Sequence, residues 1–204
     1  MIKRILSIFI LNIVIVFAYA QNNAMEGKEF YLNFMENQYS PTLYIRYVVS
    51  NTCYITTQYG DGTYLDNNVQ YTPGTYTKQV DINKAYTTAT VAVSNNKYMK
   101  VVSTEKIGVY AINLANVSTD AATILPVEAL GNHYTVISNE SYPSSVKASY
   151  ISVIAPTTGT IITIKDIAGT VDSISKIDKD ILYKCYNTFY HPSNTIMIFA
   201  RRFL

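Results

Sequence analysis

Short segments of alternating apolar and polar residues, separated by turn-forming residues, run through most of this chain. In Thr42–Ser50 the side chains of Leu43, Ile45, Tyr47 and Val49 fall on one side of an extended backbone. A period of two residues is typical of a half-buried β-strand. This periodicity therefore predicts strands rather than helices.

The same alternation recurs along the chain, in Glu29–Glu36, Cys53–Tyr59, Thr75–Ile82, Thr90–Ser94, Tyr98–Ser103, Ile107–Leu114, His133–Ser138, Ser149–Ala155 and Thr160–Asp166. Turn signals such as Pro73-Gly74 and Asn95-Asn96 stand between these segments. Strands at intervals of roughly 8–12 residues with such punctuation predict an antiparallel β-sandwich. The 19 Tyr residues, and the abundance of Val, Ile and Thr, favour the same all-β class.

The pair Asp61-Gly62 has two interpretations, a calcium loop or a hairpin turn. The regular series of calcium-binding oxygen ligands is missing around it. A type I′ turn, in which Gly62 takes a positive φ, explains the pair without a metal. We therefore expect a hairpin.

An approximate internal repeat begins at Gly27 and again at Gly131. Each copy has an aromatic residue three positions later, Phe30 or Tyr134, and a long strand, a turn and a second strand after it. This predicts two related β units, in residues 21–118 and 119–204, after a segment 1–20. The second unit is expected to be smaller, or truncated, because the pattern is lost beyond Asp166.

The first 20 residues have the organisation of a secretory signal peptide. Lys3 and Arg4 precede an apolar run, and the segment closes on Ala18-Tyr19-Ala20. A membrane anchor is the alternative, but the run is shorter than the ~20 residues that span a bilayer. Because Gln21 follows the cleavage site, a lipid-anchoring cysteine is absent there. We expect export to a secreted, periplasmic or cell-surface location.

Cleavage would leave a formally neutral chain. The sequence has 16 basic and 14 acidic residues, and Lys3 and Arg4 leave with the signal segment. A neutral chain without a basic cluster argues against nucleic acid and against anionic lipid as main partners.

Residues that carry chemistry are sparse. With only His133 and His191 in the chain, the sequence has no zinc-ligand spacing, and we predict no metal or cofactor. Cys53 and Cys185 are either two buried thiols or one disulfide. His133 is expected on the outer side of a strand rather than in a catalytic pair, and recognised hydrolase motifs are absent. The sequence thus predicts a protein that is not an enzyme.

Tyrosines are the remaining candidates for ligand contact. They crowd the first unit, and exposed Tyr offers contact area at low entropic cost. The alternative is that Tyr simply fills strands in this composition. Weak candidates for ligand contact are Tyr44, Tyr59, Tyr64 and Tyr71.

The segment Met99–Ser138 carries a linked series of residues: Ser103, Ile107, Val109-Tyr110-Ala111, Asn113, Thr119-Asp120, Pro126, Leu130-Gly131 and Tyr134. Together with Gly27, Phe30 and Pro73-Gly74-Thr75, this series resembles the signature of the IgGFc-binding protein N-terminal domain family. Asp120, Pro126 and Gly131 also suit a connection between two β units, so the signature residues are interpreted as structural.

The resemblance implies a secreted or surface-exposed β-sandwich module without catalytic residues. Binding of antibody Fc is not carried over to this chain, and the early end relative to the family suggests a truncated second unit. The expected function is a non-enzymatic binding or adhesion module that recognises an extracellular protein or glycan. The alternatives are a structural spacer in a larger exported protein and an exported hydrolase.

Overall fold

The computed structural model describes residues 25–35, 41–87, 92–93, 96–116, 119–131, 133–134, 150–154, 160–165, 171–177, 181–183, 189–190 and 197–201. Met1–Ala20, Cys185 and His191 lie outside this part, so the export signal and a Cys53 to Cys185 pair stay predictions. Cys53 itself is buried. Within the described residues, no helix is long and apolar enough to cross a membrane.

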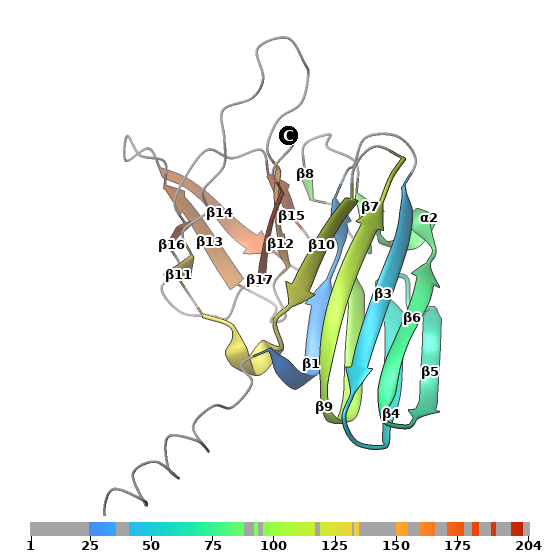
Figure 1. Cartoon of the computed structure of the whole chain (residues 1–204). Coiled ribbons are helices and arrows are strands. Elements are labelled where there is room, and N and C mark those ends of the chain that lie inside the picture. The colour runs from blue at the N-terminus through green and yellow to red at the C-terminus, as the bar shows by residue number, and fades with distance from the viewer. Residues whose placement is uncertain are drawn as a thin grey trace, which may run out of the picture.

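The described chain is all-β, as the alternation predicts (Figure 1). Its first strands are β1 (Glu26–Leu32), β2 (Phe34–Met35), β3 (Thr42–Val49), β4 (Cys53–Tyr59), β5 (Tyr64–Tyr71), β6 (Gly74–Val80), β7 (Tyr86–Thr87), β8 (Ala92–Val93), β9 (Met99–Leu114) and β10 (Thr119–Ile124). Two short helical elements accompany them, α2 (Ile82–Ala85) and the 3-10 helix η1 (Val127–Ala129). The later strands are β11 (His133–Tyr134), β12 (Tyr150–Ile154), β13 (Thr160–Lys165), β14 (Val171–Ile177), β15 (Ile181–Tyr183), β16 (Phe189–Tyr190) and β17 (Met197–Arg201).

Strand β9 organises the main sheet because it pairs with four other strands. Its first half, from Met99 to Ser103, lies between β1 and β4. Its second half, from Ile107 to Leu114, lies between β3 and, over most of its length, β10. Adding β5 beside β4 and β6 beside β3 gives two four-stranded layers, β1-β9-β4-β5 and β10-β9-β3-β6, which share one strand. Figure 1 shows the second layer, with β10, β9, β3 and β6 side by side.

The two layers enclose an apolar core. In β3 the residues Leu43, Ile45, Tyr47 and Val49 are buried and their neighbours face outward, as predicted from the period of two. The buried side chains of β9 also fall on alternate positions on both sides of its midpoint. The same face of strand β9 therefore lines the core in both layers.

The midpoint of β9 is a corner. Ser103 and Ile107 are buried, but the three residues between them are exposed. Strand β1 pairs Gly27 with Ile107 and Glu29 with Val102, so it passes over this corner with an irregular register. A strand that moves from one layer to the other at a bend is one way to build the corner of a sandwich.

The sequence predicted two strands, Tyr98–Ser103 and Ile107–Leu114, where the structure has the single strand β9. The exposed corner residues interrupt the apolar pattern without interrupting the hydrogen-bonded ladder. The expected strand Thr75–Ile82 ends at Val80, because Asp81 caps α2 by accepting a hydrogen bond from the backbone N–H of Asn83.

The turn at Asp61-Gly62 is a hairpin, but it is not of type I′. A type I′ turn needs positive φ at both central residues, and of Gly60, Asp61 and Gly62 only Gly62 has a positive φ, +86°. Tyr59 N–H donates to Thr63 C=O at 2.8 Å, which closes a three-residue loop. Asp61 accepts from the backbone N–H and the hydroxyl of Thr63, so its carboxylate stabilises the loop.

The remaining described strands form two small antiparallel sheets and one parallel pair. The division into units 21–118 and 119–204 stays a prediction. Strand β10 belongs to the main sheet through β9, and β8 pairs with β15 in a sheet with β12 and β17. Strands β11, β16, β13 and β14 form another sheet. The short pair of β2 with β7 is parallel. Strands β14 to β17 were not predicted, because their segments lack clear alternation.

Candidate functional site

The most concentrated polar group in the described core surrounds Asp66. We call Tyr47, Thr57, Asp66, Tyr71 and Lys78 the Asp66 cluster. Its members come from β3, β4, β5 and β6, so both layers of the sandwich contribute. The side chain of Asp66 is 1% exposed, whereas that of Lys78 is 36% exposed.

An irregularity in β5 directs two members of the Asp66 cluster inward. Asp66 and Tyr71 are five positions apart and would face opposite sides of a regular strand. The register between β4 and β5 shifts near Asn68, which has a φ of +51° and donates its N–H to the hydroxyl of Thr56. Such a bulge re-aims the residues that follow it, so Asp66 and Tyr71 are both buried.

The carboxylate of Asp66 accepts from three side chains. Lys78 Nζ lies 2.6 Å and the Tyr71 hydroxyl 3.0 Å from Oδ1, and the Tyr47 hydroxyl lies 3.1 Å from Oδ2. The hydroxyls of Tyr47 and Thr57 are 2.6 Å apart. The ring of Tyr71 also packs edge-on against those of Tyr47 and Tyr76.

Burial and the nearby carboxylate set the protonation of this cluster. Desolvation is the main cause that raises the pKa of Tyr47 well above 10.0, with the charge of Asp66 adding to it. The pKa of Tyr71 is raised for the same two reasons, against the effect of Lys78. For Lys78 desolvation alone would lower the pKa, but the hydrogen bonds to Asp66 and Tyr71 outweigh it and raise the pKa. The tyrosines therefore stay neutral donors and the lysine stays a cation.

The Asp66 cluster is suited to stabilising the fold and not to acting as a general base or a nucleophile. A general base must be able to reach a substrate proton, and a lysine nucleophile must lose its own proton. The carboxylate of Asp66 is enclosed by its donors, and Lys78 is held in its charged form. The Asp66 cluster thus acts as a polar connection between the two layers.

Two smaller groups repeat the combination of a lysine, a carboxylate and a tyrosine ring. Lys100 lies 2.8 Å from Glu29 and 5.3 Å from the ring centre of Tyr31. Lys84 lies 3.6 Å from Asp61, next to the ring of Tyr59. Desolvation alone would raise the pKa of Glu29, but the hydrogen bonds from Lys100 and Tyr31 lower it.

The four candidate contact tyrosines do not form one site. Tyr59 and Tyr71 are buried, and their hydroxyls bind the backbone N–H of Asp81 and the carboxylate of Asp66. Tyr44 is half-buried on β3, and Tyr64 is 49% exposed at the start of β5. Only Tyr64 has the exposed ring that the contact hypothesis requires, because inward-facing strand positions hold Tyr59 and Tyr71 in the core.

Several signature residues make one close structural contact. A Cβ on Gly27 would lie 2.2 Å from Cβ of Pro126 and 2.9 Å from the Glu128 carboxylate, so β1 passes η1 closely only because Gly27 has no side chain. The hydroxyl of Tyr134 accepts from the N–H of Gly131 at 2.9 Å and fixes the segment after η1.

The other signature residues lie in or beside the main sheet. Phe30 is fully buried, and the Asn113 side chain donates to the C=O of Met35 at 2.9 Å. Tyr110, Asp120 and Leu130 are half-buried. Asp120 was interpreted as part of a connection between two β units, but it lies within β10, paired with Asn113 of β9.

The two histidines of the chain cannot be placed as catalytic residues. His191 lies outside the described part of the chain, as does the side chain of His133. Among the described side chains, no three His, Cys, Asp or Glu residues come together as a potential metal site. The sequence interpretation missed Asp66, although a single acid between the strand-like residues of Tyr64–Tyr71 was a usable signal.

Comparisons with known proteins give one short likeness. No family model and no solved structure matches the chain. A stretch of 32 residues is 72% identical to a protein named "Uncharacterized zinc protease YmfH" of Bacillus subtilis (strain 168). The match covers 16% of this chain and 8% of that protein. The chain therefore matches less than a tenth of the length of this relative.

This likeness corrects the function expected from the sequence. The prediction of a binding or adhesion module is wrong, because the similar protein is named a protease and no comparison links the chain to adhesion. That the chain is not an enzyme stays a prediction. The membership in the IgGFc-binding N-terminal domain family, and an extracellular protein or glycan as partner, stay predictions.

Proposed function

We propose that the main sheet of this chain, formed by β1, β3, β4, β5, β6, β9 and β10 and called the β domain, is a non-catalytic domain of an exported protein that takes part in peptide hydrolysis. The Asp66 cluster carries the first half of the proposal. Its carboxylate accepts hydrogen bonds from three side chains of the protein itself, and the charged donor among them, Lys78, is held as a cation. The acid and base groups of this domain thus serve its stability.

The link to peptide hydrolysis rests on the short likeness to a protein named a zinc protease. Among the described residues no three His, Cys, Asp or Glu side chains come together, and the proposal places catalysis outside the β domain. Export is supported by the order of basic, apolar and small residues in Met1–Ala20.

The proposal is tested with the purified full chain and a mixture of fluorogenic peptides, with and without added Zn²⁺ and a chelator. Asp66→Asn, Glu29→Gln and Asp61→Asn each remove one of the three carboxylates that face a lysine. We expect every variant to cleave at the wild-type rate per folded molecule, whether that rate is zero or measurable.

Circular dichroism at the assay temperature confirms that each variant is folded. A variant that keeps its fold and loses chelator-sensitive cleavage would place a catalytic group in the β domain and disprove the proposal.

A further inference from the structure

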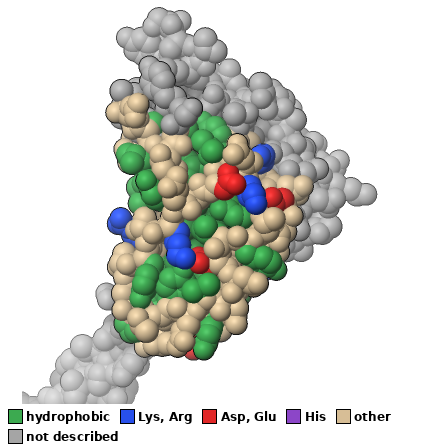
Figure 2. Space-filling model, turned by 90° about the vertical axis from the view of Figure 1, so that its right-hand side faces the viewer, with side chains coloured by type: hydrophobic (Ala, Val, Ile, Leu, Met, Phe, Trp, Pro, Cys, Tyr) green, Lys and Arg blue, Asp and Glu red, His purple; other side chains and the backbone are tan. Residues whose placement is uncertain are grey.

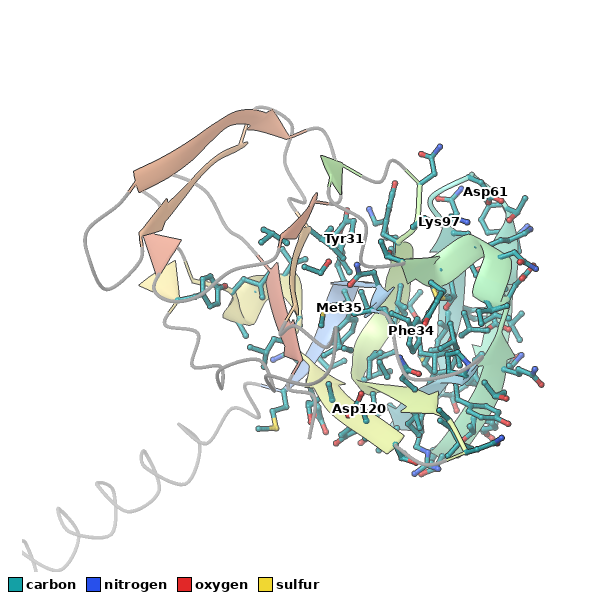
Figure 3. The ribbon with its side chains drawn as sticks, turned by 90° about the horizontal axis from the view of Figure 1, so that it is seen from above. Tyr31, Phe34, Met35, Asp61, Lys97 and Asp120 are labelled. Carbon is teal, nitrogen blue, oxygen red and sulfur yellow. The ribbon has the colours of Figure 1, made fainter. Side chains whose placement is uncertain are left out.

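The outer face of the layer β10-β9-β3-β6 carries a single charged residue, Arg46. We call the outward-facing residues of Thr42–Val49, Gly74–Val80, Ile107–Leu114 and Thr119–Ile124 the Arg46 face. They occupy alternate positions of four paired strands, and all of them except Arg46 are uncharged. In Figure 1 this layer faces the viewer, and Figure 3, in which Asp120 of β10 is labelled, shows no other described strand outside it.

The other charged residues of these strand segments lie on the inner face. Lys78 pairs with the buried Ile45, and Asp120 pairs with the buried Asn113. Directly opposed residues of paired strands lie on the same face of a sheet. Neither charge therefore faces outward beside Arg46, and the Arg46 face is positive at one point.

Arg46 is exposed, and β6 holds its side chain from one side. Its Nε donates a hydrogen bond to Oγ1 of Thr77 at 3.0 Å. It forms no ion pair with a described carboxylate, whereas Lys78, Lys84 and Lys100 each face one. The guanidinium is a planar fork of N–H donors that matches a carboxylate. Because Nε is used, Nη1 and Nη2 remain to donate side by side to an anion.

Next to Arg46 the same face offers apolar surface. Tyr44 lies two positions before Arg46 on β3 and pairs with Ile112 of β9. Both side chains are half-buried, and Leu114, two positions further along β9, is 44% exposed. Residues two apart on a strand are ~7 Å from each other. A ligand that fits this surface has one anionic group and an apolar group close to it.

The single charge selects among possible ligands. Nucleic acids and anionic lipid surfaces carry many negative charges and are bound through several basic residues, which the Arg46 face lacks. A peptide that ends in an apolar residue carries one carboxylate at its C-terminus and an apolar side chain beside it. Hydrolysis of a peptide bond creates such an end on one of the two products.

We propose that the Arg46 face binds the C-terminal carboxylate of a peptide whose last residue is apolar. Nη1 and Nη2 of Arg46 donate to the carboxylate, and the apolar side chain packs on Tyr44 and Ile112. The inference rests on the proposed function, because peptide hydrolysis supplies these ends. One exposed ion pair contributes little to affinity, so we expect a dissociation constant on the order of 1 mM.

An NMR titration of the full chain, with a chelator present to stop metal-dependent cleavage, measures the binding. The probes are the tripeptide Ala-Ala-Leu with a free C-terminal carboxylate and the same tripeptide with a C-terminal amide. We expect the acid to shift backbone amide signals of β3 and β9, and the amide to bind about fivefold more weakly. Equal binding of the two probes, or no binding of the acid up to about 10 mM, would overturn the proposal.

Two substitutions at Arg46 locate the site. Arg46→Gln should reduce the affinity for the acid to that for the amide, and Arg46→Lys should keep part of the difference, because it keeps the charge but loses the fork. Lys106→Gln removes an exposed positive charge at the corner of β9 and is the matched control, which should bind like the wild type. Undiminished binding by Arg46→Gln would contradict the inference.

This titration and the cleavage assay on the carboxylate variants fail separately. The titration reads binding alone, and Asp66→Asn, Glu29→Gln and Asp61→Asn leave Arg46 in place. A catalytic group found in the β domain by the cleavage assay would disprove the proposed function without changing the titration. Loss of the difference between acid and amide would disprove the Arg46 site without changing the cleavage rates of those variants.

Discussion

At the scale of single residues, Asp66 shows why a buried acid need not be catalytic. Ionised carboxylates are rarely buried without partners, because their desolvation is costly. Here three side chains supply hydrogen bonds, and one of them, Tyr71, is a tyrosine that the sequence presented as a possible ligand contact. On the face shown in Figure 2, basic and acidic side chains also lie next to one another rather than in a field of one sign.

Asp66→Asn should lower the free energy of unfolding by about 1–3 kcal/mol, because charged hydrogen bonds are lost and buried donors are left poorly paired. Urea denaturation followed by circular dichroism measures the change. Asp61→Asn, in an exposed loop next to Lys84, is the control and should change stability much less. Equal effects of the two substitutions would contradict a special role for Asp66.

Stability should also fall at alkaline pH. The pKa values of Tyr47 and Tyr71 are raised above 10.0 in the folded chain, so the unfolded chain loses these protons first. The contribution of these two tyrosines to stability is complete below about pH 10. It decreases as the pH rises towards the pKa values that the tyrosines have in the folded chain. For Tyr47 the limiting slope is about 1.4 kcal/mol per pH unit.

Urea midpoints between about pH 8 and 11, a range that brackets the ordinary tyrosine pKa, measure this loss. Tyr47→Phe should be less stable at neutral pH but should show a flatter decline. An unchanged decline in Tyr47→Phe would show that other groups cause the alkaline effect.

At the scale of elements, alternation predicted β3, β4 and most of β9 well, because their buried residues lie on one face of a regular strand. It missed β5, where the bulge at Asn68 changes which residues face inward. The Asp66 cluster was not predicted either, because its members come together only when four strands are in register. Spacing along one chain carries no information on pairing between strands.

Because β1 passes close to η1, an added methyl group should affect stability more at Gly27 than at Gly108. Gly27→Ala should destabilise the chain by about 1–3 kcal/mol, because the new Cβ would overlap Pro126. Gly108→Ala is the control, because its Cβ would meet neighbours at ordinary contact distances of 3.5 Å or more. Thermal melts of both variants provide the comparison, and equal melting temperatures would contradict the close approach.

At the scale of the whole molecule, the shared strand β9 couples the two layers. Each layer takes half of its length, and the two halves are joined without a linker. Neither layer can lose β9 without affecting the other. The β domain is therefore expected to unfold as one cooperative unit.

Ile107→Ala, at a fully buried position beside the corner, should cost about 2–5 kcal/mol. Hydrogen exchange with mass spectrometry should show faster exchange in both β3 and β4, although β4 does not pair with the altered residue, whereas β3 and β1 do. Faster exchange confined to β3 would mean that the layers open independently.

The position of β9 in the chain has a consequence for biosynthesis. Strands β1, β3 and β4 are made before Met99–Leu114, the segment against which all three are hydrogen-bonded. Until that segment leaves the ribosome, the earlier strands lack the partner that completes their layers. We therefore expect a nascent chain of this design to stay unfolded over about its first hundred residues, and an unfolded chain is the state that a translocation channel accepts.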